Sequence, residues 1–159
     1  MQIDIIAVGK IKEEYLRQGI AEYAKRLGPY VKLKQIEVPD VAVLQDASLA
    51  TIDQSVAKEG QAILAQLKPQ SYNIALAIEG KTMTSPELAD YLDALALKGE
   101  SHLTFIIGGS HGLDTKVLRA SQMQLSFGSF TYPHQLMRLI LLEQLYRACK
   151  IRQKEPYHK

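Results

Sequence analysis

Two short apolar runs, each ending in a glycine-bearing polar loop, constrain the fold of this chain more than any other feature. The first run covers residues 103–107 and stops at loop 108–112, and the second covers residues 123–127 and stops at loop 128–133. A long apolar segment with helical periodicity follows directly. Ligands of open α/β sheets bind beyond the carboxyl ends of the strands. The stretch therefore predicts that both loops border a site for a small cofactor.

Strands and helices alternate along all 159 residues, a length that suits one domain. Apolar runs alternate with segments that carry apolar residues at three- and four-residue steps. The expected strands are residues 3–8, 31–38, 72–78, 103–107 and 123–127, and the expected helices are residues 13–27, 51–67, 85–97, 114–120 and 134–151. This alternation predicts an α/β fold over residues 1–159, with a mostly parallel sheet and helices on both faces.

The last expected helix is apolar on almost every side in its first half. Its apolar residues there are Leu136, Met137, Leu139, Ile140, Leu141, Leu142 and Leu145. A helix that is apolar all round must be buried on more than one side. Because one sheet covers only one side of the helix, we expect a second subunit to cover the other.

Basic residues gather at the C-terminal end, although the net charge of the chain is only +2. Residues 138–159 contain six basic and two acidic side chains, a local charge of +4. The basic residues are Arg138, Arg147, Lys150, Arg152, Lys154 and Lys159. Such a segment is typical of a protein with an anionic partner, but a solvated helix end has the same composition, since cations favour the C-terminal end of the helix dipole.

Several classes of protein are disfavoured by features that the sequence lacks. Cys149 is the only cysteine, so neither an internal disulfide nor a cysteine-based metal cluster is expected, and the four histidines show no metal-binding spacing. No segment has the length and apolarity of a membrane span, and the first residues lack the pattern of a signal peptide. The sequence predicts a cytoplasmic protein without a metal site.

Loop 108–112 also fits the pattern G-x-S-x-G, in which a serine after a strand is the nucleophile of α/β hydrolases. Ser110 would be that nucleophile. Asp114 follows too closely to complete a triad, so Glu143 or Glu155 would have to serve, and the chain is short for that fold. Neither G-x-G-x-x-G nor G-x-x-x-x-G-K-[ST] occurs, so the sequence carries no nucleotide fingerprint. A cofactor pocket, a hydrolase site and ordinary glycine turns remain open on pattern alone.

Longer stretches of the sequence closely resemble one known family. They read IIAVGKIKEEY at the start, IIGGSHGL and LSFGSFTYPHQLMRLILLEQLYRA in the second half, and EPYHK at the end. The family is RlmH, the bacterial ribosomal large-subunit methyltransferases of the SPOUT superfamily. Its members use S-adenosylmethionine to methylate N3 of a pseudouridine in a stem-loop of 23S rRNA. The resemblance implies a homodimer and a C-terminal part threaded into a trefoil knot, although knots are nearly absent from proteins in general.

The resemblance also implies which residues hold the cofactor. By matching motifs these are Leu76, Gly108, Phe127, Gly128, Ser129, Phe130, Thr131 and Tyr132. The tail at residues 156–159 matches the family's tail, which closes over the site of the partner subunit. Lys159 stands where members often have arginine, and lysine keeps the charge without the bidentate geometry toward phosphate.

Methylation of a ring nitrogen requires loss of its proton, and a general base contributes about 10²–10⁴-fold. The candidates are His134 near the second loop and Tyr157 or His158 in the tail. His134 fits equally well as a plain helix-start residue after Pro133. We expect the tail to position the substrate rather than to act as a strong base.

The six basic residues of the C-terminal segment are expected to contact RNA phosphates, while an unpaired loop nucleotide supplies base specificity. Because the net charge of the chain is small, we expect the large ribosomal subunit or the 70S ribosome to be a better substrate than free 23S rRNA. A non-catalytic ribosome-assembly or RNA-binding module with the same fold is the alternative to an enzyme.

Overall fold

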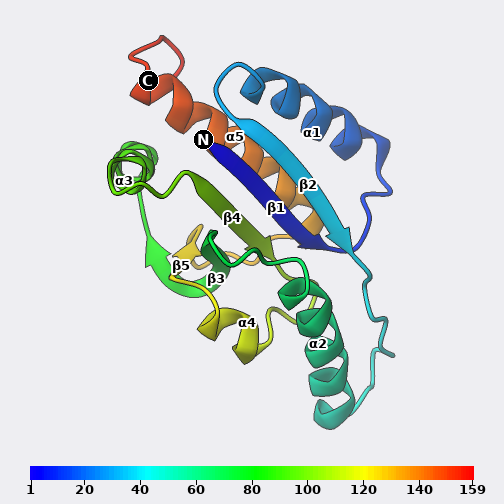
Figure 1. Cartoon of the computed structure of the whole chain (residues 1–159). Helices are drawn as coiled ribbons and strands as arrows, with labels where there is room; N and C mark the ends of the chain where they lie inside the picture. Colours follow the sequence, from blue (N-terminus) through cyan, green and yellow to red (C-terminus); the bar gives the residue numbers. More distant parts are fainter.

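The computed structural model describes all 159 residues and contains one five-stranded sheet and five helices (Figure 1). The strands are β1 Gln2–Val8, β2 Lys32–Val38, β3 Tyr72–Thr82, β4 His102–Ile107 and β5 Met123–Ser126. The helices are α1 Glu14–Leu27, α2 Leu49–Leu64, α3 Ser85–Leu97, α4 Thr115–Arg119 and α5 His134–Arg152. The strand order is β2-β1-β4-β3-β5, and every neighbouring pair is parallel. All five carboxyl ends therefore point to the same edge of the sheet.

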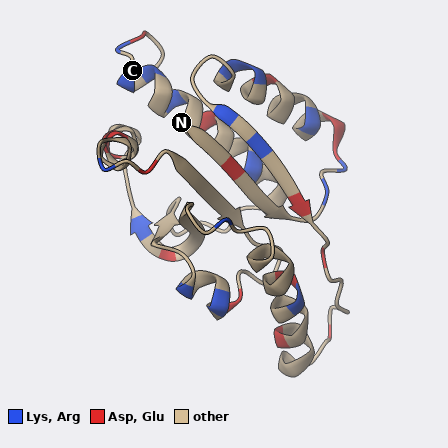
Figure 2. Cartoon of the chain, in the orientation of Figure 1, with Lys and Arg blue, Asp and Glu red and all other residues tan.

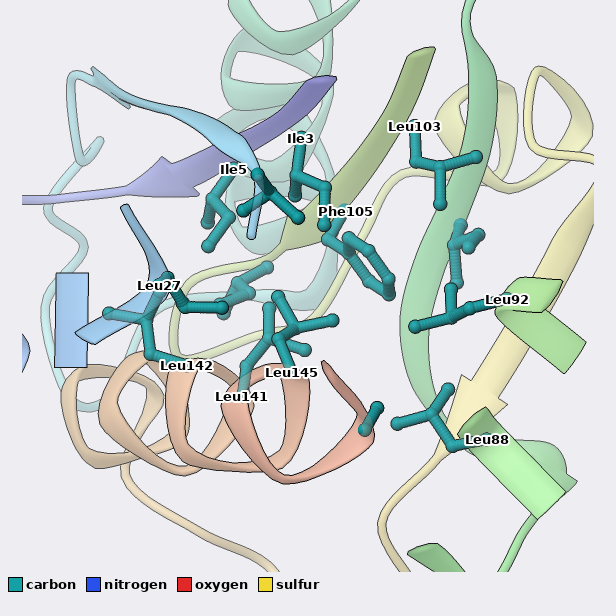
Figure 3. Packing of buried hydrophobic residues seen from close by; sticks show 14 of the residues in the cluster. Ile3, Ile5, Leu27, Leu88, Leu92, Leu103, Phe105, Leu141, Leu142 and Leu145 are labelled. Carbon is teal, nitrogen blue, oxygen red and sulfur yellow. The ribbon is translucent and has the colours of Figure 1, made fainter. Parts of the chain in front are cut away.

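Helices cover both faces of the sheet. Helices α1, α3 and α5 pack on one face, where Ile3 of β1 lies in a buried cluster with Leu142 of α5 (Figure 3). Helices α2 and α4 pack on the other face, where Ile6 lies in a second cluster with Ile63 and Val117. Successive side chains of a strand point to opposite faces, so β1, which is apolar apart from Gln2 and the buried Asp4, serves both layers. The predicted α/β fold with a parallel sheet is confirmed, and the trefoil knot stays a prediction.

Helix α5 packs on the sheet and against both α1 and α3, and no residue from 134 to 150 is exposed. Leu141 and Leu142 are fully buried. Helix α1 comes so close at Gly19 that a Cβ there would lie 3.0 Å from Cδ2 of Leu139. These two flanking helices cover much of the apolar surface that we expected a second subunit to cover. The apolar surface of α5 therefore does not by itself require a second subunit, and the homodimer stays a prediction.

Strand β3 is longer than the sequence predicted, because it continues past Ile78 through a polar segment. Its first half pairs with β4, and it pairs with β5 in two registers that shift between Leu76 and Lys81. Gly80 is required at this irregularity, since a Cβ there would lie 2.6 Å from the backbone oxygen of Gln124. The irregularity lies where β3 runs along the carboxyl end of β5.

Helix α2 also differs from its expected bounds of 51–67. It begins at Leu49 because Ser48 caps it, with the Ser48 hydroxyl accepting a hydrogen bond from the Thr51 N–H at 3.2 Å. It ends at Leu64, and the next residues form a turn. None of the helices combines the length and the apolarity needed to cross a membrane.

Candidate active site

A cavity of about 1080 Å³ opens at the carboxyl edge of the sheet, beside the middle of β3 and the ends of β4 and β5. Its walls come from residues within 76–79, 107–113 and 124–137, together with Leu118 of α4. The two glycine loops singled out by the sequence are therefore walls of one cavity. Its volume is slightly above the range of about 300–1,000 Å³ that is typical of pockets for small ligands.

The structure brings together seven of the eight residues expected to hold the cofactor. Those that line the cavity are Leu76, Gly108, Phe127, Gly128, Phe130, Thr131 and Tyr132. Ser129 is exposed in the same loop and does not line the cavity. The eight residues come from strand β3 and from both loops, so only the folded sheet makes them neighbours. Their contact with a cofactor stays a prediction.

The first loop is a tight turn that only glycines allow. The Gly112 N–H donates to the Gly109 carbonyl at 3.1 Å, and Gly112 has a φ of +80°. A Cβ on Gly108 would lie 2.8 Å from the backbone oxygen of Gly112. Backbone thus forms this wall of the cavity, where a ligand can approach the peptide groups closely.

The second loop is held by Ser126, a residue that the sequence reading missed. The Ser126 hydroxyl donates to the Ile78 carbonyl at 2.7 Å and accepts from the Gly128 N–H at 3.1 Å. Gly128 has a φ of +106°, which a side chain would disfavour. A serine at the end of an apolar strand, two residues before a glycine, is the signal that points to such a turn.

The hydrolase interpretation finds no triad in the structure. Ser110 lines the cavity, but Glu143 lies in the middle of α5 and Glu155 beyond its end, and each of these carboxylates forms an ion pair. Asp114 caps α4. None of the three acids is placed to orient a histidine beside Ser110.

His134 is the first residue of α5 and lines the cavity. Its Nε2 lies 3.7 Å from where a Cβ on Gly9 would be. Burial lowers the pKa of the imidazole below its ordinary 6.5; the carboxylates of Asp40 and Glu13 oppose this shift, and the Arg138 guanidinium adds to it. His134 is therefore neutral at pH 7, which is the form that accepts a proton.

Arg138 is buried, with 4% of its surface exposed, and this position corrects its predicted role. Its guanidinium donates to a carboxylate oxygen of Glu37 at 2.8 Å and to the Gly9 carbonyl at 2.9 Å. Arg138 therefore ties α5 to the carboxyl ends of β1 and β2. The prediction that it contacts RNA is wrong, because protein atoms cover the guanidinium.

Arg138→Met is expected to lower the free energy of unfolding by about 2 kcal/mol, because it leaves the Gly9 carbonyl without its buried donor. The Glu37 side chain is 43% exposed, so water can replace the donor that its carboxylate loses. Urea denaturation followed by circular dichroism measures this change. The control Lys154→Met removes an exposed cation that has no ion pair and should cost less than about 0.5 kcal/mol. A loss of unfolding free energy below about 1 kcal/mol for Arg138→Met would show that the contacts of Arg138 with Glu37 and Gly9 do not stabilise the fold.

Basic positions, coloured blue, gather toward the C-terminal end of the chain in Figure 2. Three more of the cations expected to bind RNA are engaged in ion pairs in this region. The pairs are Arg147–Glu143, Lys150–Glu155 and Arg152–Asp93. Lys154 and Lys159 are exposed and form no ion pair. RNA contact by these five residues stays a prediction. For the three that form ion pairs, an RNA phosphate would have to compete with the carboxylate of the pair.

The two tail candidates lie at the opposite end of α5 from His134 (Figure 1). This helix has 19 residues and is therefore about 28 Å long, so Tyr157 and His158 do not reach the cavity of their own chain. Burial, followed by hydrogen bonds with Tyr23 and Glu143, raises the pKa of Tyr157. A phenol with a raised pKa holds its proton more firmly, which disfavours Tyr157 as a general base, and its catalytic role stays a prediction.

An open parallel α/β sheet with glycine loops around a cavity at its carboxyl edge defines a protein that binds a small ligand there. A family profile described as "Predicted SPOUT methyltransferase" matches residues 1–158. This chain therefore belongs to the SPOUT methyltransferase family.

Individual relatives agree with this membership. The chain is 56% identical to "Ribosomal RNA large subunit methyltransferase H" of Carboxydothermus hydrogenoformans and 52% identical to the protein of the same name from Exiguobacterium sibiricum, over 100% of both chains in each case. Among solved structures, a probable methylase family protein from Haemophilus influenzae Rd KW20 has a TM-score of 0.57 at 13% identity, over 99% of this chain and 70% of that chain. This last likeness is one of fold.

Proposed function

We propose that this chain is an S-adenosylmethionine-dependent methyltransferase that modifies N3 of a pseudouridine in 23S rRNA. Two full-length relatives, each more than half identical to this chain, are named ribosomal RNA large subunit methyltransferase H. The observation that carries the proposal is one cavity lined by seven of the eight residues expected to hold the cofactor. Transfer of an isotopically labelled methyl group to 23S rRNA tests it, and cofactor binding without such transfer would favour a non-catalytic module.

The residues of the cavity fit S-adenosylmethionine. No lysine or arginine lines the cavity, so nothing there favours a ligand with phosphates, and the Glu79 carboxylate suits a positively charged one. Leu76 and Phe127 offer apolar surface for a flat base. The glycine backbone at Gly108 and Gly128 lets N–H and C=O groups approach the polar edges of a ligand.

S-adenosylmethionine, when bound, supplies a methyl group on a positively charged sulfur. The chain has two tasks in the transfer. The two loops hold the reacting groups in line, which accounts for most of the acceleration. The neutral His134 accepts the proton that the ring N3–H must lose, so that nitrogen can form its new bond to carbon.

The methylation rate is expected to fall with decreasing pH through the lowered pKa of His134. Only the neutral imidazole accepts a proton, and a pKa below 6.5 keeps it neutral throughout the neutral range. Single-turnover rates should therefore be flat above about pH 7 and should decline at lower pH. His134→Gln should lose this acid limb and slow the reaction about 100-fold. An unchanged profile in His134→Gln would show that another group is the base.

The proposal includes a homodimer in which the tail of each chain completes the cavity of the other. Residues 156–159 lie near the far end of α5, about 28 Å from the helix start that lines their own cavity. In a dimer, the tail of a second copy can reach this cavity. The cytoplasm, where ribosomes are made, is the proposed location.

Ribosomes are expected to be methylated at least about tenfold faster than free 23S rRNA at equal concentration. With only Lys154 and Lys159 free of ion pairs in the C-terminal segment, phosphate contacts alone give weak binding that falls further as salt rises. A ribosomal particle adds a fixed shape for the protein to recognise. Filter-bound methyl counts on both substrates measure the ratio, and equal rates would overturn the preference.

A further inference from the structure

The C-terminal arm, defined as residues 155–159, is fastened to its own subunit. The Glu155 carboxylate accepts hydrogen bonds from the Lys150 ammonium at 2.6 Å and from the Tyr30 hydroxyl at 2.5 Å. Lys150 belongs to α5, whereas Tyr30 follows α1. The start of the arm is thereby fixed to two elements.

The next anchor of the arm is Tyr157. Its ring meets the Tyr146 ring edge-on at 4.9 Å between centroids, and the Arg147 guanidinium lies 4.7 Å from its ring centroid. Its hydroxyl donates to an oxygen of Glu143 at 3.0 Å, and Arg147 binds the same oxygen at 2.6 Å. Glu143, Arg147 and Tyr157 thus form a closed set of contacts, which we call the arm clamp.

The arm clamp also sets the chemistry of His158. Arg147 Nη1 lies 3.4 Å from Nδ1 of His158. Guanidinium carries only donors, so Nδ1 must accept in this contact. A neutral imidazole that accepts at one nitrogen carries its proton on the other. His158 is exposed, and its Nε2–H is left free to donate.

We propose that Arg147 is a positioning residue of the reaction: through the arm clamp it presents His158 to a second copy as a hydrogen-bond donor. This inference rests on the proposed function, in which the arm enters the partner's cavity. The donor would bind a pyrimidine carbonyl oxygen next to N3. Loss of the N3 proton to the base places negative charge on that oxygen, where a fixed donor stabilises it. No proton is transferred to or from His158.

The tautomer of His158 tests the clamp without any substrate. Long-range ¹H–¹⁵N spectra at about pH 8.5, where ordinary imidazoles are neutral, distinguish the two tautomers. The protein should carry the proton on Nε2, and Arg147→Met should give a mixture. Arg26→Met is the matched control, because Arg26 lies near the Tyr146 ring without touching the arm, and it should leave the tautomer unchanged. A proton on Nδ1 in the unsubstituted protein would overturn the proposal.

Kinetics then tests the role of the donor. His158→Ala should reduce the single-turnover rate about 100-fold and Arg147→Met about tenfold. The double variant should be no slower than His158→Ala, because Arg147 acts through His158. His158→Gln, which keeps an N–H donor but no base, should recover about tenfold over His158→Ala. Independent losses in the double variant, or no recovery with glutamine, would contradict the proposal.

If the unsubstituted protein transfers no methyl group, the proposed function fails. The tautomer of His158 still tests whether the arm clamp forms.

Discussion

Replacing Gly108 by alanine is expected to weaken S-adenosylmethionine binding by at least about 100-fold, which corresponds to about 2.7 kcal/mol. The added Cβ would lie 2.8 Å from the backbone oxygen of Gly112, and backbone cannot rotate away as a flexible side chain can. The turn of loop 108–112 must therefore shift, and it forms a wall of the cavity. Isothermal titration calorimetry measures the affinity, and circular dichroism shows that the variant still folds.

The matched control is Gly99→Ala at the end of α3. Gly99 has a φ of +88° and nothing within 4 Å of an added Cβ, and it does not line the cavity. Alanine there should cost about 1–2 kcal/mol of backbone strain while cofactor affinity stays unchanged. Affinity near the unsubstituted value for Gly108→Ala would mean that loop 108–112 does not hold the cofactor.

Deletion of residues 156–159 is expected to reduce methylation at least about 100-fold while weakening cofactor binding much less. These residues lie outside the cavity of their own chain, so the loss arises from the cavity of the other copy. Separate measurements by calorimetry and methyl transfer are required. If binding and methylation both survive the deletion intact, the tail has no role in the reaction.

Mixing the two defective proteins distinguishes a shared site from a site within one chain. In a mixed dimer, the Gly108→Ala chain contributes an intact tail and the tail-deleted chain contributes an intact cavity. Random exchange of subunits in a symmetric dimer restores about a quarter of the sites. Mixtures that stay as inactive as their components would exclude the exchange of tails between subunits.

The fold was predictable because its signals are local. Apolar runs and helical periodicity place all ten elements, and strict alternation of strands and helices predicts a parallel sheet. The extension of β3 past Ile78 was missed because polar residues there pair with β5, a contact that is distant in sequence. The apolar surface of α5 is covered largely by α1 and α3, and packing between helices leaves no direct trace in the pattern of one helix.

Features of the site that depend on backbone shape were predictable from the sequence. Features that depend on which side chains are buried were less predictable. Glycines after apolar runs located both loops, but the charge of Arg138 suggested an exposed contact with RNA. Only the folded chain shows that its guanidinium lies inside, bonded to Gly9 and Glu37. Ser126 was missed for the same reason, because its partner Ile78 belongs to another strand.

The most direct test of the central claim is mass mapping of 23S rRNA after incubation of ribosomes with this protein and S-adenosylmethionine carrying a labelled methyl group. We expect one pseudouridine of the 23S rRNA to gain one labelled methyl group at N3, and Gly108→Ala to abolish the gain. A labelled methyl group on a different nucleotide or in a different RNA, or no label despite bound cofactor, would contradict the claim.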